Sequence, residues 1–247
     1  APQLGALAVR GALERAGISK SEVQEVILGN VISADLGQAP ARQAVIEAGL
    51  SQSTVCTTVN KMCASGMKAI MLSAQSVMLG HNNCMIAGGF ESMTNAPYYL
   101  SKARFGYKLG DGTMVDSILK DGLTDAYNGK HMGWCAEQTA RKYSLTREDQ
   151  DNYALESYRR AQDATKNGYF QNEIISVAVP GKGETKFVSE DEEPKNIKLD
   201  KVPTLKPAFL KEGGTITAAN SSTLSDGAAA LVIMSEEKAR RAGLRPI

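Results

Sequence analysis

The chain has 247 residues, of which 43% are hydrophobic, and 28 Lys and Arg residues nearly balance 27 Asp and Glu residues. This length is enough for one large domain or two, each with its own core. A net charge of +1 and the lack of a long apolar run argue against nucleic-acid and membrane partners. Four cysteines without CxxC spacing and two histidines argue against a disulfide framework and a zinc site, so a reducing compartment fits best.

The first fifty residues alternate between helical and strand patterns. Apolar residues at three- and four-residue steps predict a helix over residues 4–13, with Gly17 as its C-cap. VQEVILGNVI (Val23–Ile32) predicts a strand, and Ala41–Ala48 predicts a second helix. Strands that alternate with helices of this length indicate an α/β fold, with a mainly parallel sheet covered by helices on both faces.

The next stretch, VCTTVNKMCASGMKAIMLSAQSVMLGHNNCMIAGGFESM (55–93), predicts a strand, a helix and a strand in succession. The strands are expected at Val55–Val59 and Cys84–Ala87, and a mostly buried helix between Ala64 and Gly80. Cys63 lies at the joint between strand and helix, where free N–H groups and the positive helix end favour a thiolate. Cys63 is therefore a candidate nucleophile, and the alternative is one more buried cysteine.

The regular alternation fails from about Asn95. Local patterns then predict a short helix at 114–119, helices at 136–143 and 146–166, a strand at 175–180 and a solvated acidic loop at 189–193. The alternation returns with AAALVIM (Ala228–Met234), which has the composition of a buried strand, and with a helix at Ser235–Ala242. We expect a core domain formed by 1–95 and 221–247, interrupted by an inserted domain, 96–220, of normal size.

Four blocks of sequence resemble the thiolase family. They are VNKMCASGMKAI followed by AGGFESM, GQAPARQA (Gly37–Ala44), KDGLTDAYNGKHMG (Lys120–Gly133) and GGTITAANSSTLSDGAAALV (Gly213–Val232). The blocks occur in the family's order and cover nearly the whole chain. Within the family, the likeness is greatest to the members that transfer acetyl groups between acetyl-CoA molecules, particularly the mitochondrial type.

The resemblance implies a thiolase-like core with an inserted loop domain, in a chain that looks like the N-terminal half of a longer protein. The core would be incomplete at both ends, and a C-terminal thiolase domain with a catalytic histidine and a second cysteine would be absent. We therefore expect this chain alone to be inactive. The implied complete protein is a homotetramer, a dimer of dimers, in the mitochondrion, with the cytoplasm as the alternative.

The implied activity is the reversible Claisen condensation of two acetyl-CoA molecules to acetoacetyl-CoA and coenzyme A. Cys63 would attack the thioester and carry the acetyl group. One alternative is a long-chain 3-ketoacyl-CoA thiolase, which the loop around Lys108–Asp116 and the KHMG string disfavour. The other is a non-catalytic fragment that binds acyl-CoA. Neither His81 nor His131 is placed by the sequence to act as the base for Cys63.

The resemblance also implies contacts for coenzyme A, which is a substrate. His131 and Met132 would line the acyl end of the pocket, and Ser222 would touch the pantetheine. Lys201 would lie near the phosphates, although an exposed loop lysine is an equal alternative. Where family members have an Arg-containing adenine motif, this chain has Asn196–Lys198, so no adenine contact is carried over.

A potassium ion is the cofactor that the resemblance implies. Backbone oxygens of Ala218, Ala219 and Ser221 would bind it together with Tyr158, which is also assigned to the substrate site. This chain has serine at 221 where similar members have alanine, and a backbone ligand survives that change. The alternatives are an ordinary connecting loop and a core tyrosine.

The other cysteines and the other histidine are given structural roles. Cys56 and Cys84 lie in apolar strand patterns, and Cys135 beside Trp134 is expected to be packed. His81 follows Gly80 at a helix end and is expected at the surface.

Overall fold

The computed structural model describes residues 1–246. The chain divides into two compact units, of which the first contains residues 1–122 and 225–247 and the second contains residues 123–224. The domain bounds expected from the sequence, with an insertion of 96–220, stay a prediction, and residues 96–122 belong to the first compact unit. No helix within residues 1–246 is both long and apolar enough to cross a membrane.

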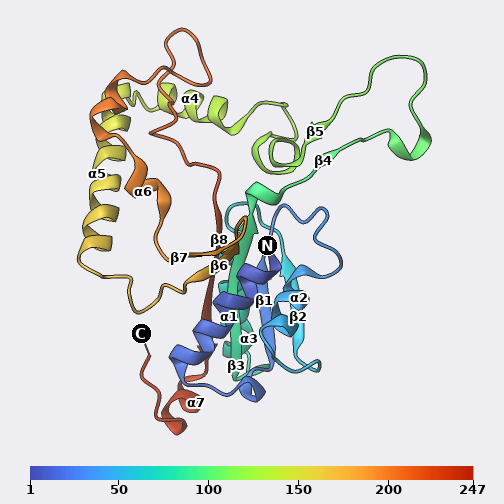
Figure 1. Cartoon of the computed structure of the whole chain (residues 1–247). Helices are drawn as coiled ribbons and strands as arrows, with labels where there is room; N and C mark the ends of the chain where they lie inside the picture. Colours follow the sequence, from blue (N-terminus) through green and yellow to red (C-terminus); the bar gives the residue numbers. More distant parts are fainter. Residues whose placement is uncertain (247) are drawn as a thin grey trace. The chain divides into compact units, whose positions relative to one another are not determined.

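A four-stranded sheet forms the centre of the first unit, in the order β2-β1-β3-β8. The strands are β1 (Glu25–Gly29), β2 (Val55–Val59), β3 (Cys84–Ser92) and β8 (Asp226–Met234). β1 pairs in parallel with β2 and with β3, whereas β8 is antiparallel to β3. The mainly parallel sheet expected from the sequence is confirmed, with one antiparallel strand at its edge (Figure 1).

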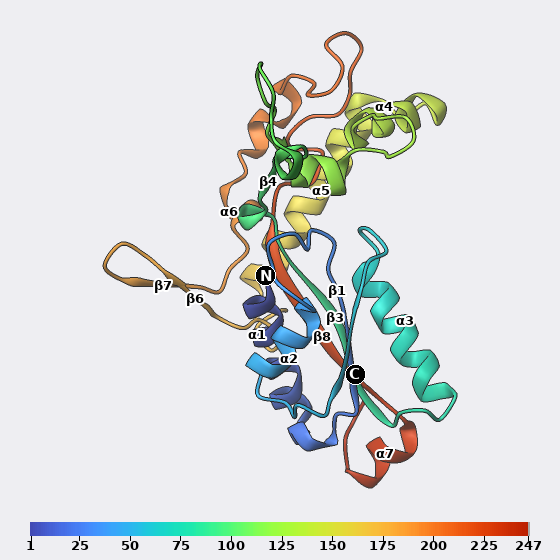
Figure 2. The ribbon, with the colours of Figure 1, turned by 90° about the vertical axis from the view of Figure 1, so that its right-hand side faces the viewer.

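Helices cover both faces of this sheet. α1 (Pro2–Ala16) and α2 (Pro40–Glu47) lie on one face, and α3 (Ser65–Met78) lies on the other (Figure 2). Side chains alternate along β1: Val26 and Leu28 join the α1–α2 core, and Ile27 packs with Ala69 of α3. The continuous apolar run in the sequence of β1 therefore contributes side chains to the hydrophobic layers on both faces of the sheet.

Two elements are less buried than their apolar sequences predict. On α3, Met67 is 66% exposed and Met78 is 84% exposed, while the buried residues are Ser65, Ala69 and Ser73. The prediction of a mostly buried helix was wrong, because only Ser65, Ala69 and Ser73 are fully buried, while Ile70, Leu72 and Val77 pack against the sheet and stay partly buried. The buried-strand reading of Ala228–Met234 was also wrong: β8 is an edge strand within the described residues, and most of its residues are exposed or half-buried.

The first unit also carries several short elements. They are η1 (Lys20–Glu22), η2 (Met93–Asn95), β4 (Tyr98–Tyr99), η3 (Ala103–Phe105), β5 (Val115–Asp116) and α7 (Glu236–Arg241). A π-helix, Ile118–Leu123, follows β5 and ends at the boundary of the units. The helix expected at 114–119 was partly wrong: Val115 and Asp116 form β5, which pairs with β4 at the base of a long loop (Figure 1), and the helix begins only at Ile118.

The second unit is mainly helical. Its elements are α4 (Met132–Lys142), α5 (Arg147–Lys166), the hairpin of β6 (Val177–Pro180) and β7 (Thr185–Val188), α6 (Glu192–Asn196) and η5 (Leu199–Thr204). α5 begins with the expected cap: the Thr146 and Asp149 side chains each accept a hydrogen bond from the other's backbone N–H. The acidic loop expected at 189–193 was partly wrong, because α6 begins at Glu192.

Candidate functional site

Cys63 lies in a tight turn that joins β2 to α3 in the first unit, and its side chain is exposed. The preceding residue, Met62, has a φ of 51°, in the left-handed region that side chains other than glycine rarely adopt. Asn60 Oδ1 accepts a hydrogen bond from the Met62 N–H at 3.0 Å, and Ser65 Oγ accepts one from the Lys61 N–H at 2.8 Å. Neutral side chains on both sides therefore hold the turn that presents the thiol.

Glycines let the start of α3 lie directly against the backbone of the sheet. A Cβ added at Gly29 of β1 would lie 2.6 Å from the backbone carbon of Ser65. A Cβ added at Gly89 of β3 would lie 3.5 Å from the Cα of Gly66. Contacts between backbones, rather than polar side chains, thus fix where the helix begins and where Cys63 is presented.

The first turn of α3 has hydrogen-bond donors to spare. The backbone N–H groups of Gly66 and Met67 make no hydrogen bond within residues 1–246, as is usual for the first turn of a helix. A thiol next to such donors suits acyl transfer, in which a nucleophile attacks a carbonyl and the resulting oxyanion needs donors. Burial raises the pKa of the Cys56 and Cys84 thiols.

The two histidines have different settings. His81 is exposed beyond the far end of α3, and a helix of that length separates it from Cys63 by about 20 Å, so His81 cannot be its base. His131 is the N-cap of α4 in the second unit, where its Nδ1 accepts a hydrogen bond from the Gly133 N–H at 2.9 Å. With Nδ1 as the acceptor, the ring hydrogen lies on Nε2, which is left as a donor.

The beginning of α4 combines an exposed apolar residue with packed rings. Met132 is 40% exposed. The His131 ring stacks on Phe209 with 4.8 Å between ring centroids. Phe209 also covers Gly133, where an added Cβ would lie 2.3 Å from the ring. Lys130 places its Nζ 5.7 Å from the centre of the Trp134 ring. The stacking on Phe209 and the hydrogen bond from Gly133 fix the direction of the His131 ring, which the family resemblance assigns to the acyl end of the substrate pocket.

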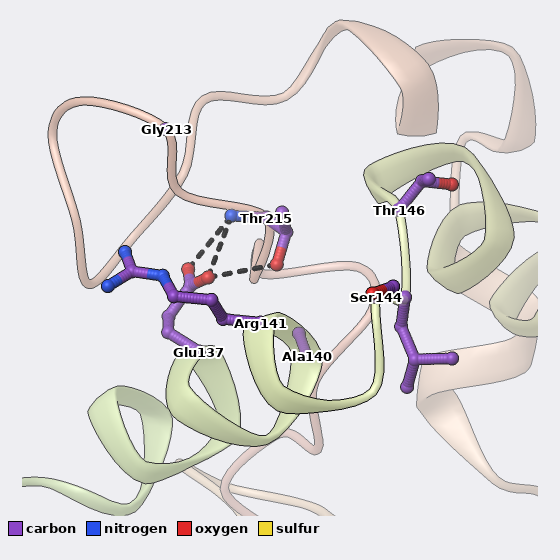
Figure 3. Close-up of a pocket in the computed structure, with 8 residues that line it drawn as sticks. Glu137, Ala140, Arg141, Ser144, Thr146, Gly213 and Thr215 are labelled. Atoms are coloured by element: carbon purple, nitrogen blue, oxygen red, sulfur yellow. Dashed lines mark hydrogen bonds between the residues drawn. The ribbon is translucent and has the colours of Figure 1, made fainter.

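Glu137 of α4, which the sequence did not single out, holds the strand-like segment after Gly213 (Figure 3). Its carboxylate is buried and accepts hydrogen bonds from the backbone N–H groups of Thr215 and Ile216, both at 2.9 Å, and from the Thr215 hydroxyl. Burial alone would raise the pKa of Glu137, but these hydrogen bonds outweigh it and hold that pKa below its ordinary value. The signal in the sequence was a charged residue on the stripe Gly133, Glu137 and Ala140, all of which are buried.

A second carboxylate holds the other side of the same segment. Asp151 of α5, also buried, accepts a hydrogen bond from Asn220 Nδ2 at 2.9 Å. Asn220 Oδ1 accepts one from the Thr217 N–H at 2.7 Å, and the Ser221 hydroxyl donates to the Thr217 carbonyl oxygen. The residues 213–222, here called the loop segment, therefore form a compact turn held by α4 and α5.

Three of the potassium ligands expected from the sequence lie in the loop segment, and the fourth, Tyr158, lies on α5. Ala218 is exposed, Ala219 is buried and Ser221 is half-buried in the loop segment. The Tyr158 hydroxyl donates to Glu193 Oε1 at 2.9 Å; burial and this hydrogen bond raise the pKa of Tyr158 to about 12. A phenol that donates its hydrogen keeps its oxygen lone pairs, so Tyr158 and the loop carbonyls fit the oxygen donors that a hard cation takes.

The remaining predicted substrate residues are at the surface of the second unit. Ser222 is exposed at the end of the loop segment, and Lys201 is exposed on η5. A hollow of about 340 Å³ lies between the end of α4, residues 144–146, Gly213 and Thr215, and its lining residues are drawn in Figure 3. None of the predicted substrate residues lines it. Within residues 1–246, no group of three His, Cys, Asp or Glu residues is arranged to hold a metal ion.

Comparisons with known proteins agree on one family. The family model described as "Thiolase, N-terminal domain" matches residues 1–237. The mitochondrial acetyl-CoA acetyltransferase of Homo sapiens is 53% identical over 248 residues, which are 100% of this chain and 58% of its own length. The acetyl-CoA acetyltransferase of Schizosaccharomyces pombe is 54% identical over 249 residues, 100% of this chain and 63% of its own length.

A solved structure gives the same result for the fold. The Acat5 thiolase from Ascaris suum, solved in complex with coenzyme A, matches with a TM-score of 0.93 and 44% sequence identity. The match covers 100% of this chain and 63% of the other. The chain therefore spans only 58% to 63% of the length of these relatives.

Proposed function

Because this chain belongs to the thiolase family through its N-terminal domain, we propose that its protein transfers an acetyl group between two acetyl-CoA molecules. The observation that carries the proposal is the exposed Cys63 thiol, presented by a strained turn beside the free donors of α3. The similarity to acetyl-CoA acetyltransferases at 53% and 54% identity supports the choice of acyl group.

The proposed reaction has two steps. The Cys63 thiolate attacks the thioester carbonyl of acetyl-CoA, and the carbon–sulfur bond to coenzyme A breaks, so that the leaving thiolate takes up a proton. A second acetyl-CoA then loses a proton from its methyl carbon and attacks the acetyl-cysteine, which releases acetoacetyl-CoA and the Cys63 thiolate. Each step is reversible. Dividing one difficult transfer into two is the usual benefit of a covalent intermediate.

The residues of the second unit would bind the thioester substrate. The Nε2–H of His131 is a donor for the acyl oxygen, and Met132 offers an apolar surface for the short acyl chain. Ser222 would contact the pantetheine, and Lys201 is suited to a phosphate as a strongly hydrated point charge. We propose that the substrates are acetyl-CoA, acetoacetyl-CoA and coenzyme A.

The test uses protein produced from the complete gene. Incubation with acetyl-CoA followed by peptide mass mapping should place the acetyl group on Cys63 and on none of Cys56, Cys84 and Cys135. Loss of acetoacetyl-CoA in the presence of coenzyme A should exceed that of a long-chain 3-ketoacyl-CoA. An acetyl group on Cys84 or Cys135 would contradict the assignment of Cys63, and a preference for the long chain would favour the degradative thiolase.

A potassium ion is proposed as the cofactor, bound by Tyr158 and the backbone oxygens of Ala218, Ala219 and Ser221. When bound, it would supply positive charge that stiffens the loop segment. Potassium chloride should raise activity above the value in sodium chloride at equal ionic strength, which removes general screening as an explanation. Tyr158→Phe should abolish this difference between the salts, and equal activity of the unchanged protein in both salts would exclude the site.

The homotetramer is also a proposal, and the loop between β4 and β5 supports it. Phe105 is 93% exposed and Leu109 is 107% exposed, although the first is a large aromatic side chain that proteins usually cover. We propose that this loop contacts other copies of the chain. Light scattering should report a tetramer, and replacing Phe105 and Leu109 with serine should reduce it to a dimer. A dimer before the replacement would contradict the proposal.

The names of the relatives bear on the location. Because the human relative is named as mitochondrial, we propose a mitochondrial location. Imaging of the tagged product of the complete gene should show it together with a mitochondrial marker. A diffuse cytoplasmic signal would favour the alternative.

A further inference from the structure

We propose that Glu137 is a positioning residue for the reaction: its carboxylate fixes the loop segment to α4, so that Ser222 and His131 bind the same coenzyme A thioester. This inference rests on the proposed function, and Glu137 itself touches no substrate.

Glu137 is buried against the loop segment and uses both of its carboxylate oxygens in the contact. Glu137 is 3% exposed, and both of its oxygens accept hydrogen bonds from the loop segment: Oε1 from the Thr215 and Ile216 N–H groups, and Oε2 from the Thr215 N–H and hydroxyl. Hydrogen bonds to a buried charge are about twice as strong as those between neutral groups. An amide of the same size offers one acceptor oxygen, so it cannot satisfy these donors equally well.

The contact of Glu137 with the loop segment lies on the same helix as His131. Glu137 follows the N-cap His131 by six residues, about 9 Å along the helix axis. The chain before the loop segment contacts the beginning of the same helix, because Phe209 stacks on His131. The Ala208 N–H donates to the Ile216 carbonyl oxygen at 2.8 Å. This hydrogen bond connects the Phe209–His131 contact with the contact between Ile216 and Glu137. A displacement of Thr215 and Ile216 would therefore also shift Phe209 against His131.

Glu137 is not the only support of the loop segment. Asn220 donates to Asp151 of α5 and to the Thr215 carbonyl oxygen, both at 2.9 Å. These bonds do not involve Glu137, so a variant at 137 should keep the fold of the second unit. What it should lose is the fixed distance between the loop segment and α4, which is a loss of substrate positioning.

The experiment compares three variants of the protein produced from the complete gene. Glu137→Gln removes the charge and one acceptor. Thr215→Val removes the hydroxyl that donates to Glu137 and also accepts from Gln150 Nε2 at 3.0 Å, and it leaves the carboxylate in place. Glu212→Gln is the matched control, since it removes the same charge from an exposed residue adjoining the loop segment. The readouts are the Kd of coenzyme A by calorimetry, the KM and kcat for acetoacetyl-CoA thiolysis, and amide hydrogen exchange by mass spectrometry.

For Glu137→Gln we expect the Kd and the KM to rise about tenfold, the size expected for losing one hydrogen bond to a charge, with kcat changed less than about twofold. Hydrogen exchange should accelerate in peptides covering 213–222 and stay unchanged in α5. Thr215→Val should raise the Kd about threefold, and Glu212→Gln should have no effect.

Other outcomes overturn the inference in distinguishable ways. A Glu137→Gln protein with the Kd and exchange rates of the Glu212→Gln control would show that the carboxylate positions nothing. Faster exchange throughout the second unit, or a fall in kcat alone, would show a merely structural role. If the unchanged protein does not bind coenzyme A, the proposed function fails, and the inference fails with it.

Discussion

The turn that presents Cys63 and the loop segment of the second unit are both irregular backbone that must stay rigid, and they are held by opposite means. The Cys63 turn depends on neutral groups and on the absence of side chains at Gly29 and Gly89, where an added Cβ would lie 2.6 Å and 3.2 Å from backbone atoms. The loop segment depends on the buried carboxylates of Glu137 and Asp151. The stability of the Cys63 turn should be sensitive to added side-chain volume and insensitive to pH. The stability of the loop segment should be sensitive to pH and less sensitive to added volume.

The largest effect should come from removing the reacting group itself. Cys63→Ala should lower kcat for acetoacetyl-CoA thiolysis by at least about a thousandfold, because loss of a nucleophile removes the covalent route. The unfolding free energy should stay nearly the same, since the side chain is exposed. Cys135→Ala, at a half-buried position on α4, is the control and should keep most activity. Comparable turnover of the two variants would remove Cys63 from the mechanism.

The next effect tests the role of added volume. In Gly29→Ala, the new Cβ would lie 2.6 Å from the backbone carbon of Ser65. A backbone atom, unlike the end of a side chain, cannot move away by a change of rotamer. We expect a loss of about 1–3 kcal/mol of unfolding free energy, the usual range for overpacking, measured by urea denaturation. Gly227→Ala is the control on β8, because nothing lies within 4 Å of its added Cβ. Equal stability of both variants would show that α3 is not held by close packing.

The smallest effect tests the role of charge. Hydrogen bonds hold the pKa of Glu137 below its ordinary value in the folded chain, so its contribution is present above the unfolded pKa. That contribution is lost as the pH falls through the lower, folded pKa. Stability of the unchanged protein should therefore decline in acid by about 1–2 kcal/mol more than that of Glu137→Gln, as measured by urea denaturation between neutral and acidic pH.

A surface carboxylate provides the contrast for the charge test. Arg159 and Arg160 hold the pKa of Glu156 at about 2 through exposed ion pairs, which salt screens. Glu156→Gln should leave the acid dependence of stability nearly as it is at moderate salt. Parallel acid profiles for the unchanged protein and Glu137→Gln would contradict the role of the buried carboxylate.

The sequence predicted the elements around Cys63 well because local patterns determine them. The β-branched run of β2, the periodic helix α3 and the apolar β3 all lie within 55–93, so no distant contact was needed to recognise them. The alternation of helix and strand indicated parallel pairing. The order of the strands in the sheet depends on contacts between distant residues, which local patterns do not give. The exposure of Met67 and Met78 could not be read locally, because an apolar helix does not tell which of its sides meets the sheet.

The supports of the loop segment were beyond local reasoning. Glu137 and Thr215 are 78 residues apart, and Asp151 and Asn220 are 69 apart. A glutamate in a helix usually faces solvent, so its burial follows only from folding of the second unit. The Tyr158–Glu193 hydrogen bond was missed for a similar reason, because the acidic stretch read as a solvated loop became α6. The candidate ligands at 218–222 came from family resemblance, and their roles stay predictions.

The ring of Trp134 gives the second unit a natural optical reporter. It is the single tryptophan of this chain, and it lies on α4 three residues from Glu137 with Lys130 near its face. Within this chain, fluorescence excited selectively at indole therefore comes from α4, and the first unit contributes no tryptophan emission. Loosening of the loop segment, or arrival of a thioester at the beginning of α4, should change the emission of this one fluorophore without any attached dye.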